Sequence, residues 1–326
     1  MRILFFPAGD YKLASTRLQV YERVKALRKY GIKADIVLKL KRSNKKRNII
    51  RFFVFPFIFW HYDVIFFQKT TNLICYVFAK LSNLFGKKTL FHTDDYITQE
   101  IKGTIRMFKT CDISLVASHF LLNIANKYSN HVYILPPFAD IKIFKIKHHK
   151  NKKNIILGWL GRTLSEDLEL IIPVIRKISK KYNVTLKIIG RIDKKILLEL
   201  SKYSKTIDTG WIDPLKVPNE LLKIDIALLP LKNDILHRAA LPTKLLEYMA
   251  AGLPVVASAV GEVKYIIKDG KNGFIANNLD EWKNKLEALI KNYKLRNKIG
   301  YNARLTIMKK YTLEKTTSLL IKILNQ

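Results

Sequence analysis

The sequence predicts an α/β protein built from two doubly wound, Rossmann-like domains. Short, uninterrupted apolar runs alternate with longer helical patterns, which is typical of parallel strands buried on both faces. The alternation stops at a polar, basic stretch, residues 140–154, and then starts again. A chain of 326 residues is long for one domain and comfortable for two. We therefore expect a first domain over residues 1–145, a second over 146–310 and a final helix over 311–326.

The apolar runs place the expected strands in order. In the first domain they are residues 2–6, 34–38, 63–68, 89–92, 113–118 and 132–137. In the second domain they are residues 155–160, 184–190, 225–230 and 253–258, followed by a helix-rich part over 279–326. The first helical pattern, residues 16–31, ends in Gly31, which suits a helix C-cap. Ligands of doubly wound sheets bind beyond the carboxyl ends of the strands, so the residues that close strands are candidates for a site.

The composition bounds the class of protein. A hydrophobic content of 48% is enough for packed cores and excludes a disordered polyelectrolyte. The net charge of +33 is spread along the chain and indicates anionic lipid, nucleic acid or phosphorylated small molecules as partners. Two cysteines, Cys75 and Cys111, are too few for a disulfide framework and favour a reduced, cytoplasmic setting. The first residues, MRILFFPAGD, predict a strand and no signal peptide.

Residues 49–60 are aromatic and apolar and directly follow the basic stretch 39–48. They are too short to span a membrane, which takes about 20 residues. A basic stretch beside Phe and Trp is typical of a segment that lies on an anionic membrane, whereas a core helix before strand 63–68 is an equally good interpretation. The isoelectric point of about 10.0 also raises nucleic-acid binding, but the absence of zinc-finger spacing or an RNP motif disfavours it.

Two expected strands of the second domain end in Gly-Arg. The first ends at Gly161 and Arg162, and the second at Gly190 and Arg191. Glycine lets a ligand approach the backbone, and arginine can bind a phosphate with two hydrogen bonds. A tight turn with a solvated arginine explains either ending alone. The repetition favours a phosphate or nucleotide crevice.

The stretch 238–258, RAALPTKLLEYMAAGLPVVAS, predicts a helix that starts near Pro242 and ends at Gly252. Lys244 and Glu247 share one face of its first turns, where a surface ion pair would contribute only about 0.2–0.5 kcal/mol. A lysine at a helix start opposes the helix dipole unless an anion lies there. We interpret Lys244 as a phosphate ligand and Glu247 as an acceptor for hydroxyl groups of the same ligand.

Residues 244–258, KLLEYMAAGLPVVAS, and 260–276, VGEVKYIIKDGKNGFIA, resemble the signature region of GT-B glycosyltransferases, in particular the large retaining family four. The resemblance extends over GWLGR, TGWIDPLKVPNELLKIDIALLPL and YTLEKTTSLLIKIL, and in the first half over ASTRLQVYERVKAL, DVIFFQK and LFHTDDY. It covers nearly the whole chain and is most specific over residues 238–276.

The resemblance implies two Rossmann-like domains that face across a cleft. The first would bind the acceptor, the second would bind a nucleotide-diphosphate sugar, and the final helix would cross back to the first domain. It further implies transfer of a sugar from a UDP- or GDP-linked donor to a glycan or lipid-linked acceptor, with retention of configuration. No metal or other cofactor is expected. The protein would act in cell-surface glycan biosynthesis in the cytoplasm, with peripheral attachment to the inner face of the membrane.

Donor residues follow from the matching positions. Glu247 fits the ribose-binding second acid of a Glu-x7-Glu motif, and Arg162 fits the arginine on the donor diphosphate. Gly9 fits the glycine loop after the first strand, and Gly190 and Trp211 fall in loops that flank the base. The donor-binding set is completed by Gly161, Arg191, Lys244 and Leu245.

Two departures from the family pattern concern the donor. Ala239 stands where the first Glu of the motif is expected, which leaves the identity of the sugar open and raises an inactive or regulatory protein as an alternative. A sugar-nucleotide epimerase on the same fold is another. Glu166 and Asp167 occupy the area of the family's usual lysine, so we expect Lys244 to replace it and to stabilise the leaving diphosphate together with Arg162.

The end of the strand over residues 89–92 reads HTDDY. The resemblance aligns Asp94 with a histidine of the family and implies a catalytic or acceptor-pocket role for it. His92, Asp95 and Arg17 are further candidates on the acceptor side. A metal held by Asp94 and Asp95, or a capping role for them, are the alternatives, and a solvated arginine is the alternative for Arg17.

Overall fold

The structure is a computed structural model of the chain and describes residues 1–11, 13–37, 59–96, 100–161 and 165–326. By its internal contacts the chain divides into two units. Unit 1 comprises residues 1–137, 239–241 and 313–326, and unit 2 comprises residues 138–238 and 242–312. Among the described helices none is long and apolar enough to cross a membrane. The segment 39–58, including most of the aromatic run, lies outside the described residues.

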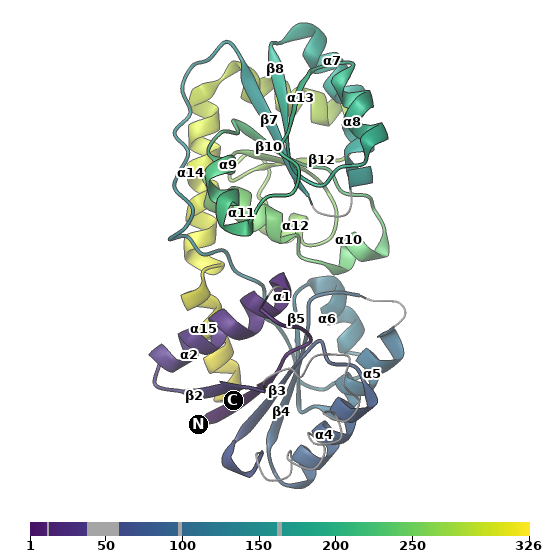
Figure 1. Cartoon of the computed structure of the whole chain (residues 1–326), viewed down its shortest axis with the longest axis vertical. Helices are drawn as coiled ribbons and strands as arrows, with labels where there is room; N and C mark the ends of the chain where they lie inside the picture. Colours follow the sequence, from purple (N-terminus) through teal and green to yellow (C-terminus); the bar gives the residue numbers. More distant parts are fainter. Residues whose placement is uncertain (12, 38–58, 97–99, 162–164) are drawn as a thin grey trace. The chain divides into compact units, whose positions relative to one another are not determined.

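Unit 1 contains a six-stranded parallel sheet in the order β2-β1-β3-β4-β5-β6. Its strands are β1 (Arg2–Phe6), β2 (Lys33–Ile36), β3 (Val64–Gln68), β4 (Lys88–Thr93), β5 (Ile113–Val116) and β6 (Val132–Ile134). Its helices are α1 (Ala14–Thr16), the π-helical turn η1 (Arg17–Glu22), α2 (Arg23–Lys29), the 3-10 turn η2 (Phe59–His61), α4 (Leu73–Leu84), α5 (Ile101–Thr110), α6 (His119–Ala125) and α15 (Leu313–Leu324). Helices α2 and α15 cover one face of the sheet and α4 and α5 the other (Figure 1).

Both faces of this sheet are apolar, which explains the unbroken hydrophobic runs in the sequence. Leu4, Ile65 and Phe91 enter the core beneath α4 and α5. Their neighbours Phe5 and Phe66 point to the opposite core, which α15 completes with Leu320, Ile323 and Leu324. The expected C-cap is also present, because Gly31 has the left-handed φ of 76° that ends the first helix.

Unit 2 contains a second parallel six-stranded sheet in the order β12-β11-β10-β7-β8-β9. Its strands are β7 (Ile155–Gly161), β8 (Val184–Gly190), β9 (Lys205–Asp208), β10 (Ile226–Leu229), β11 (Val255–Ser258) and β12 (Phe274–Ala276). Its helices are η4 (Ser165–Ile171), α7 (Ile172–Lys181), α8 (Lys194–Ser201), η5 (Pro214–Lys216), α9 (Val217–Leu221), α10 (Ile235–Ala239), α11 (Thr243–Ala250), α12 (Val263–Ile266), α13 (Leu279–Lys291) and α14 (Tyr293–Lys310). The prediction of an α/β protein with two doubly wound, Rossmann-like sheets is confirmed.

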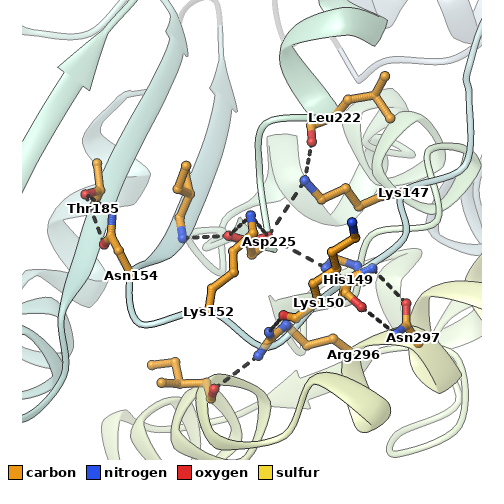
Figure 2. Close-up of polar contacts among 12 residues, drawn as sticks. Lys147, His149, Lys150, Lys152, Asn154, Thr185, Leu222, Asp225, Arg296 and Asn297 are labelled. Carbon is orange, nitrogen blue, oxygen red and sulfur yellow. Dashed lines mark hydrogen bonds and ion pairs between the residues drawn. The ribbon is translucent and has the colours of Figure 1, made fainter.

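The basic stretch 140–154, interpreted as a linker, is bound to unit 2 over its length. Arg304 donates to the backbone oxygen of Phe144 at 2.6 Å, and Asn297 exchanges two hydrogen bonds of 2.8 Å with the backbone of His149. Arg296 donates to the oxygen of Lys150 at 3.0 Å. A chain without helix or strand is held here because its backbone groups are satisfied by side chains of α14 (Figure 2).

Asp225 is the centre of this attachment. Its buried carboxylate accepts from the backbone N–H of Ile156 at 3.0 Å and from Lys152 at 3.1 Å, and it faces Lys147 and His149 (Figure 2). Burial alone would raise the pKa of Asp225, but the contacts with His149, Ile156 and Lys152 outweigh it and lower the pKa. The ionised carboxylate therefore holds the basic stretch 140–154 against the first residues of β7 and β10.

Replacement of this carboxylate is expected to destabilise unit 2 strongly. Asp225→Ala removes the acceptor of the Ile156 N–H and the carboxylate that faces the largely buried Lys147, and it should lower the free energy of unfolding by about 1–3 kcal/mol. The control is Asp280→Ala, which removes an exposed carboxylate in the first turn of α13 and should cost less than about 1 kcal/mol. Denaturant unfolding of the three proteins measures the difference, and equal losses for both variants would contradict this role of Asp225.

Candidate nucleotide-binding site

The order of strands in unit 2 reverses between β7 and β10, so the crevice of this sheet lies at their carboxyl ends. The predicted residues Gly161 and Gly190 end β7 and β8 and are direct neighbours in register. A Cβ on Gly190 would lie 1.9 Å from the backbone oxygen of Gly161, and Gly190 has a φ of 111°. A Cβ on Gly161 would lie 1.9 Å from the ring of Trp159. Both strand ends therefore require glycine, because the Trp159 ring and the Gly161 oxygen fill the space that a side chain would occupy.

Helix α11 begins beside this edge with Lys244 in its first turn. Pro242 takes the N-cap position, and no described side chain caps the helix. The ammonium of Lys244 lies 5.3 Å from the centre of the ring of fully buried Trp159. Burial lowers the pKa of Lys244, while Asp167 and Glu247 attract the charged form. Within the described part of the chain, no carboxylate comes within 4.0 Å of this ammonium. A cation desolvated in this way is a strong candidate to bind an anion.

Glu247 lies one turn further along α11 and is half-buried. The arrangement matches the predicted sequence of charges, with a cation at the helix start and an acid behind it. Leu245 is fully buried, and its N–H donates to the oxygen of Pro242 at 2.9 Å. Its contribution is therefore to the packing of α11.

A carboxylate–histidine cluster next to Lys244 was missed by sequence reasoning. Asp167, in η4, is buried and accepts from the backbone N–H of Lys232 at 3.0 Å and contacts His237 Nε2 at 3.1 Å. His237 Nδ1 is 2.8 Å from Asp234. The cluster joins the segment that follows β7 to the segment that follows β10. The available signal in the sequence is an acid, Asp167, a few residues after the end of β7. From the sequence alone it is placed only where the family has a lysine.

The other donor candidates are distributed as follows. Arg191 is exposed directly after β8, and Trp211 is 59% exposed. Gly9 follows β1 in unit 1, where a Cβ would lie 2.7 Å from Leu13 Cδ2. Arg162 lies outside the described residues. The structure thus brings Gly161, Gly190 and the start of α11 together at one edge of the sheet of unit 2.

In unit 1 the strand order reverses between β1 and β3. The acceptor candidates His92, Asp94 and Asp95 lie at or just after the end of β4, whereas Arg17 lies in η1. Lys69 bridges Asp94, at 2.8 Å, and Asp95. Burial would lower the pKa of Lys69, but the two carboxylates outweigh it and raise the pKa. Lys69 has a left-handed φ of 53°, a conformation that is costly for a residue with a side chain and is often found at functional sites. Sequence reasoning missed Lys69.

His92 and Arg17 differ in their surroundings. The ring of His92 is fully buried in β4, and its nitrogens have no hydrogen-bond partner among the described residues. Burial, with Arg23 and Lys69 nearby, lowers the pKa of His92 to about 3 and keeps it neutral. Arg17 is half-buried, with its guanidinium 5.9 Å from the centre of the Tyr11 ring. His92 is therefore enclosed in the fold, whereas Arg17 lies at its surface.

Comparison with known proteins assigns the family. Residues 140–306, about half of the chain, match the model of the glycosyl transferases group 1. The chain belongs to this family. Its members are glycosyl-transferring enzymes, and the predicted resemblance is confirmed.

Two curated relatives are similar in part. The chain is 42% identical over 60 residues to the putative teichuronic acid biosynthesis glycosyltransferase TuaH of Bacillus subtilis (strain 168), covering 18% of this chain and 15% of that protein. It is 26% identical over 178 residues to the capsular polysaccharide biosynthesis glycosyltransferase CapM of Staphylococcus aureus, covering 51% and 45%. The matched region thus spans less than half the length of either relative.

Solved structures share the GT-B fold of this chain. Anabaena HepE in complex with UDP and glucose has a TM-score of 0.74 at 12% identity, covering 100% of this chain and 99% of that one. The sucrose-phosphate synthase of Thermosynechococcus elongatus has a TM-score of 0.76 at 13% identity with the same coverage. A glycosyltransferase from Rickettsia africae has a TM-score of 0.75 at 16% identity, covering 99% and 97%.

The cluster around His237 predicts a pH-dependent stability. Hydrogen bonds to Asp167 and Asp234 raise the pKa of His237 above its ordinary 6.5 in spite of burial. Its stabilising contribution is therefore complete below pH 6.5 and is lost as the pH rises through the higher pKa of the folded protein. We expect His237→Gln to lower the free energy of unfolding at pH 6 by about 1–3 kcal/mol, and by less at alkaline pH.

Urea unfolding across this pH range measures the effect. The control is His131→Gln, which removes an exposed histidine and should leave the pH profile unchanged. A His237→Gln profile parallel to that of the wild type would show that the imidazole does not titrate with folding.

Proposed function

We propose that the protein is a glycosyltransferase that takes a sugar from a nucleotide-diphosphate donor bound at the carboxyl end of the sheet of unit 2. The observation that carries the proposal is the half-buried ammonium of Lys244, which lies over the ring of Trp159 at the start of α11. Gly161 and Gly190 end the neighbouring strands β7 and β8, and the diphosphate would lie beyond these two strand ends. Glu247 would accept hydrogen bonds from the ribose.

The proposed chemistry requires stabilisation of the leaving group. Cleavage of the bond between the anomeric carbon and the donor oxygen leaves negative charge on the nucleoside diphosphate. Lys244 and the free N–H groups at the start of α11 would receive that charge, and Arg162 would supply a second cation. One such preorganised donor is worth about 3–4 kcal/mol of transition-state stabilisation. Trp211 and Arg191 would flank the nucleotide base.

We further propose UDP as the nucleotide and a glycan or lipid-linked glycan as the acceptor. UDP is the ligand named for HepE, and the names of CapM and TuaH refer to the biosynthesis of capsular polysaccharide and teichuronic acid. Unit 1 would supply the acceptor side through Arg17 and Asp94. Retention of configuration rests on the family resemblance alone.

The proposed reaction uses no metal. Lys69 occupies the space between Asp94 and Asp95, where a divalent ion would have to lie if these two carboxylates held one. Among the described residues, no group of three or more His, Cys, Asp or Glu side chains is placed to hold an ion. Cations of the protein would then do the electrostatic work.

Binding of UDP tests the proposal. A hydrogen bond to a charged group contributes about 1.5–3 kcal/mol, so Lys244→Met should raise the Kd for UDP roughly 10- to 150-fold in titration calorimetry. Glu247→Gln should weaken UDP and leave inorganic pyrophosphate unaffected, since only UDP carries the ribose. The control is Lys309→Met, an exposed lysine of α14 that should not change the Kd. Absence of binding to UDP and GDP, or an unchanged Kd in Lys244→Met, would overturn the proposal.

The alternative of an inactive or regulatory protein has one specific observation in its favour, namely Ala239 at the position of the expected first acid. Turnover separates the two functions. A panel of UDP- and GDP-sugars, incubated in EDTA, should yield free nucleoside diphosphate from at least one donor if the protein is a metal-independent transferase. Binding of UDP with no cleavage of any donor, with or without a divalent cation and a mixture of cell-envelope glycolipids, would favour the regulatory alternative.

A further inference from the structure

We propose that unit 1 docks onto an anionic lipid bilayer through the outer face of α4 and the aromatic corner next to it. This surface, here named the α4 face, is defined by Trp60, Leu73, Ile74, Val77, Leu84 and Phe85. Binding of this surface to a bilayer does not depend on nucleotide binding in unit 2. It deepens the proposed function because a lipid-linked acceptor is reached at a membrane surface.

Helix α4 is apolar on both of its sides. Its inner side packs Cys75, Phe78 and Ala79 into the core of unit 1. On the outer side, Leu73 is 61% exposed, Ile74 41% and Leu84 77%, and Val77 lies between them at the same helical spacing. The outer side of a surface helix is normally charged or polar. A row of exposed apolar side chains instead marks a site of interaction.

The aromatic corner extends this row beyond the end of α4. Trp60, in η2, is 55% exposed, and Phe85 is 43% exposed, with their ring centres 5.0 Å apart. The ammonium of Lys87 lies 5.8 Å from the centre of the Trp60 ring. Phe59 is buried in the core of unit 1, and its ring stacks on that of Trp60 with the two centres 5.3 Å apart. Tryptophan beside lysine is typical of the interface between lipid headgroups and acyl chains.

Positive charge borders the α4 face along α4 and α5, with Glu100 as an exposed acid next to Thr71 near the start of α4. Lys80 and Arg106, from α4 and α5, lie 5.1 and 5.3 Å from the centre of the Tyr76 ring. Lys102 and Lys109 are exposed on α5, which packs beside α4 (Figure 1). The sequences of α4, of residues 85–88 and of α5 contain no Asp or Glu. Apolar side chains bordered by cations complement a bilayer with anionic headgroups.

This combination selects a bilayer over nucleic acid or a second protein. A phosphate backbone would be met by the cations but would leave the exposed leucines against a polar surface. A protein partner or a second copy of the chain would cover the leucines, yet the excess of like charge around them opposes self-association. An anionic bilayer satisfies both the apolar row and its basic border.

Co-sedimentation with vesicles tests the α4 face. The full chain should bind vesicles of phosphatidylcholine with 30% phosphatidylglycerol, bind phosphatidylcholine alone much more weakly, and lose part of its affinity at high salt. Leu73→Gln with Leu84→Gln should lower the partition coefficient at least about tenfold. The control is Leu198→Gln with Leu215→Gln, two leucines of unit 2 that are 67% and 79% exposed. All four side chains are at the surface, so folding should be retained and is verified by circular dichroism.

Several results would overturn the proposal. The first is that the wild-type protein stays in the supernatant. The second is that the Leu73→Gln/Leu84→Gln and Leu198→Gln/Leu215→Gln variants bind vesicles equally well. The third is that the protein dimerises without vesicles and that Leu73→Gln with Leu84→Gln abolishes the dimer. The Kd for UDP, measured on the same proteins, separates this proposal from the proposed function. If the wild-type protein binds UDP but does not bind vesicles, only the α4 face as a docking surface is contradicted. Vesicle binding without UDP binding contradicts only the nucleotide site.

Discussion

The proposed site depends on the ammonium of Lys244, which lies over the ring of Trp159 and would bind the donor diphosphate. A lysine in the first turn of a helix opposes the helix dipole, and burial adds a further cost to its charge. The ring of Trp159 and the more distant Asp167 and Glu247 offset part of that cost. A bound diphosphate would offset the remainder, because it brings two or more negative charges to the cation and to the free N–H groups of the helix.

The rest of unit 2 fixes the position of this cation. Gly161 lets the indole of Trp159 lie under Lys244, and Gly190 lets β8 end in register beside it. Asp167 and His237 tie the segments after β7 and β10 together, so the crevice at the reversal of strand order has a defined wall. At the opposite end of β10, Asp225 anchors the basic stretch. The site is therefore supported by polar contacts at both ends of one strand.

Much of the fold could be predicted from the sequence, because strands buried on both faces appear as apolar runs. Strands β9 and β12 were missed for a physical reason: they are short edge strands, and β9 is largely exposed, so neither forms such a run. In the candidate site, Gly161, Gly190 and Lys244 could be found because local backbone and helix-end chemistry identify them. The Asp167–His237 contact and the Lys69 bridge join residues far apart in sequence, and no local pattern reports such contacts.

The most direct test of the account is a crystal structure of the protein with UDP. We predict density for the diphosphate at the start of α11, with a phosphate oxygen within hydrogen-bond distance, about 2.7–2.9 Å, of Lys244 Nζ and with the ribose hydroxyls on Glu247. UDP bound elsewhere, or a diphosphate at this edge that Lys244 does not contact, would contradict it.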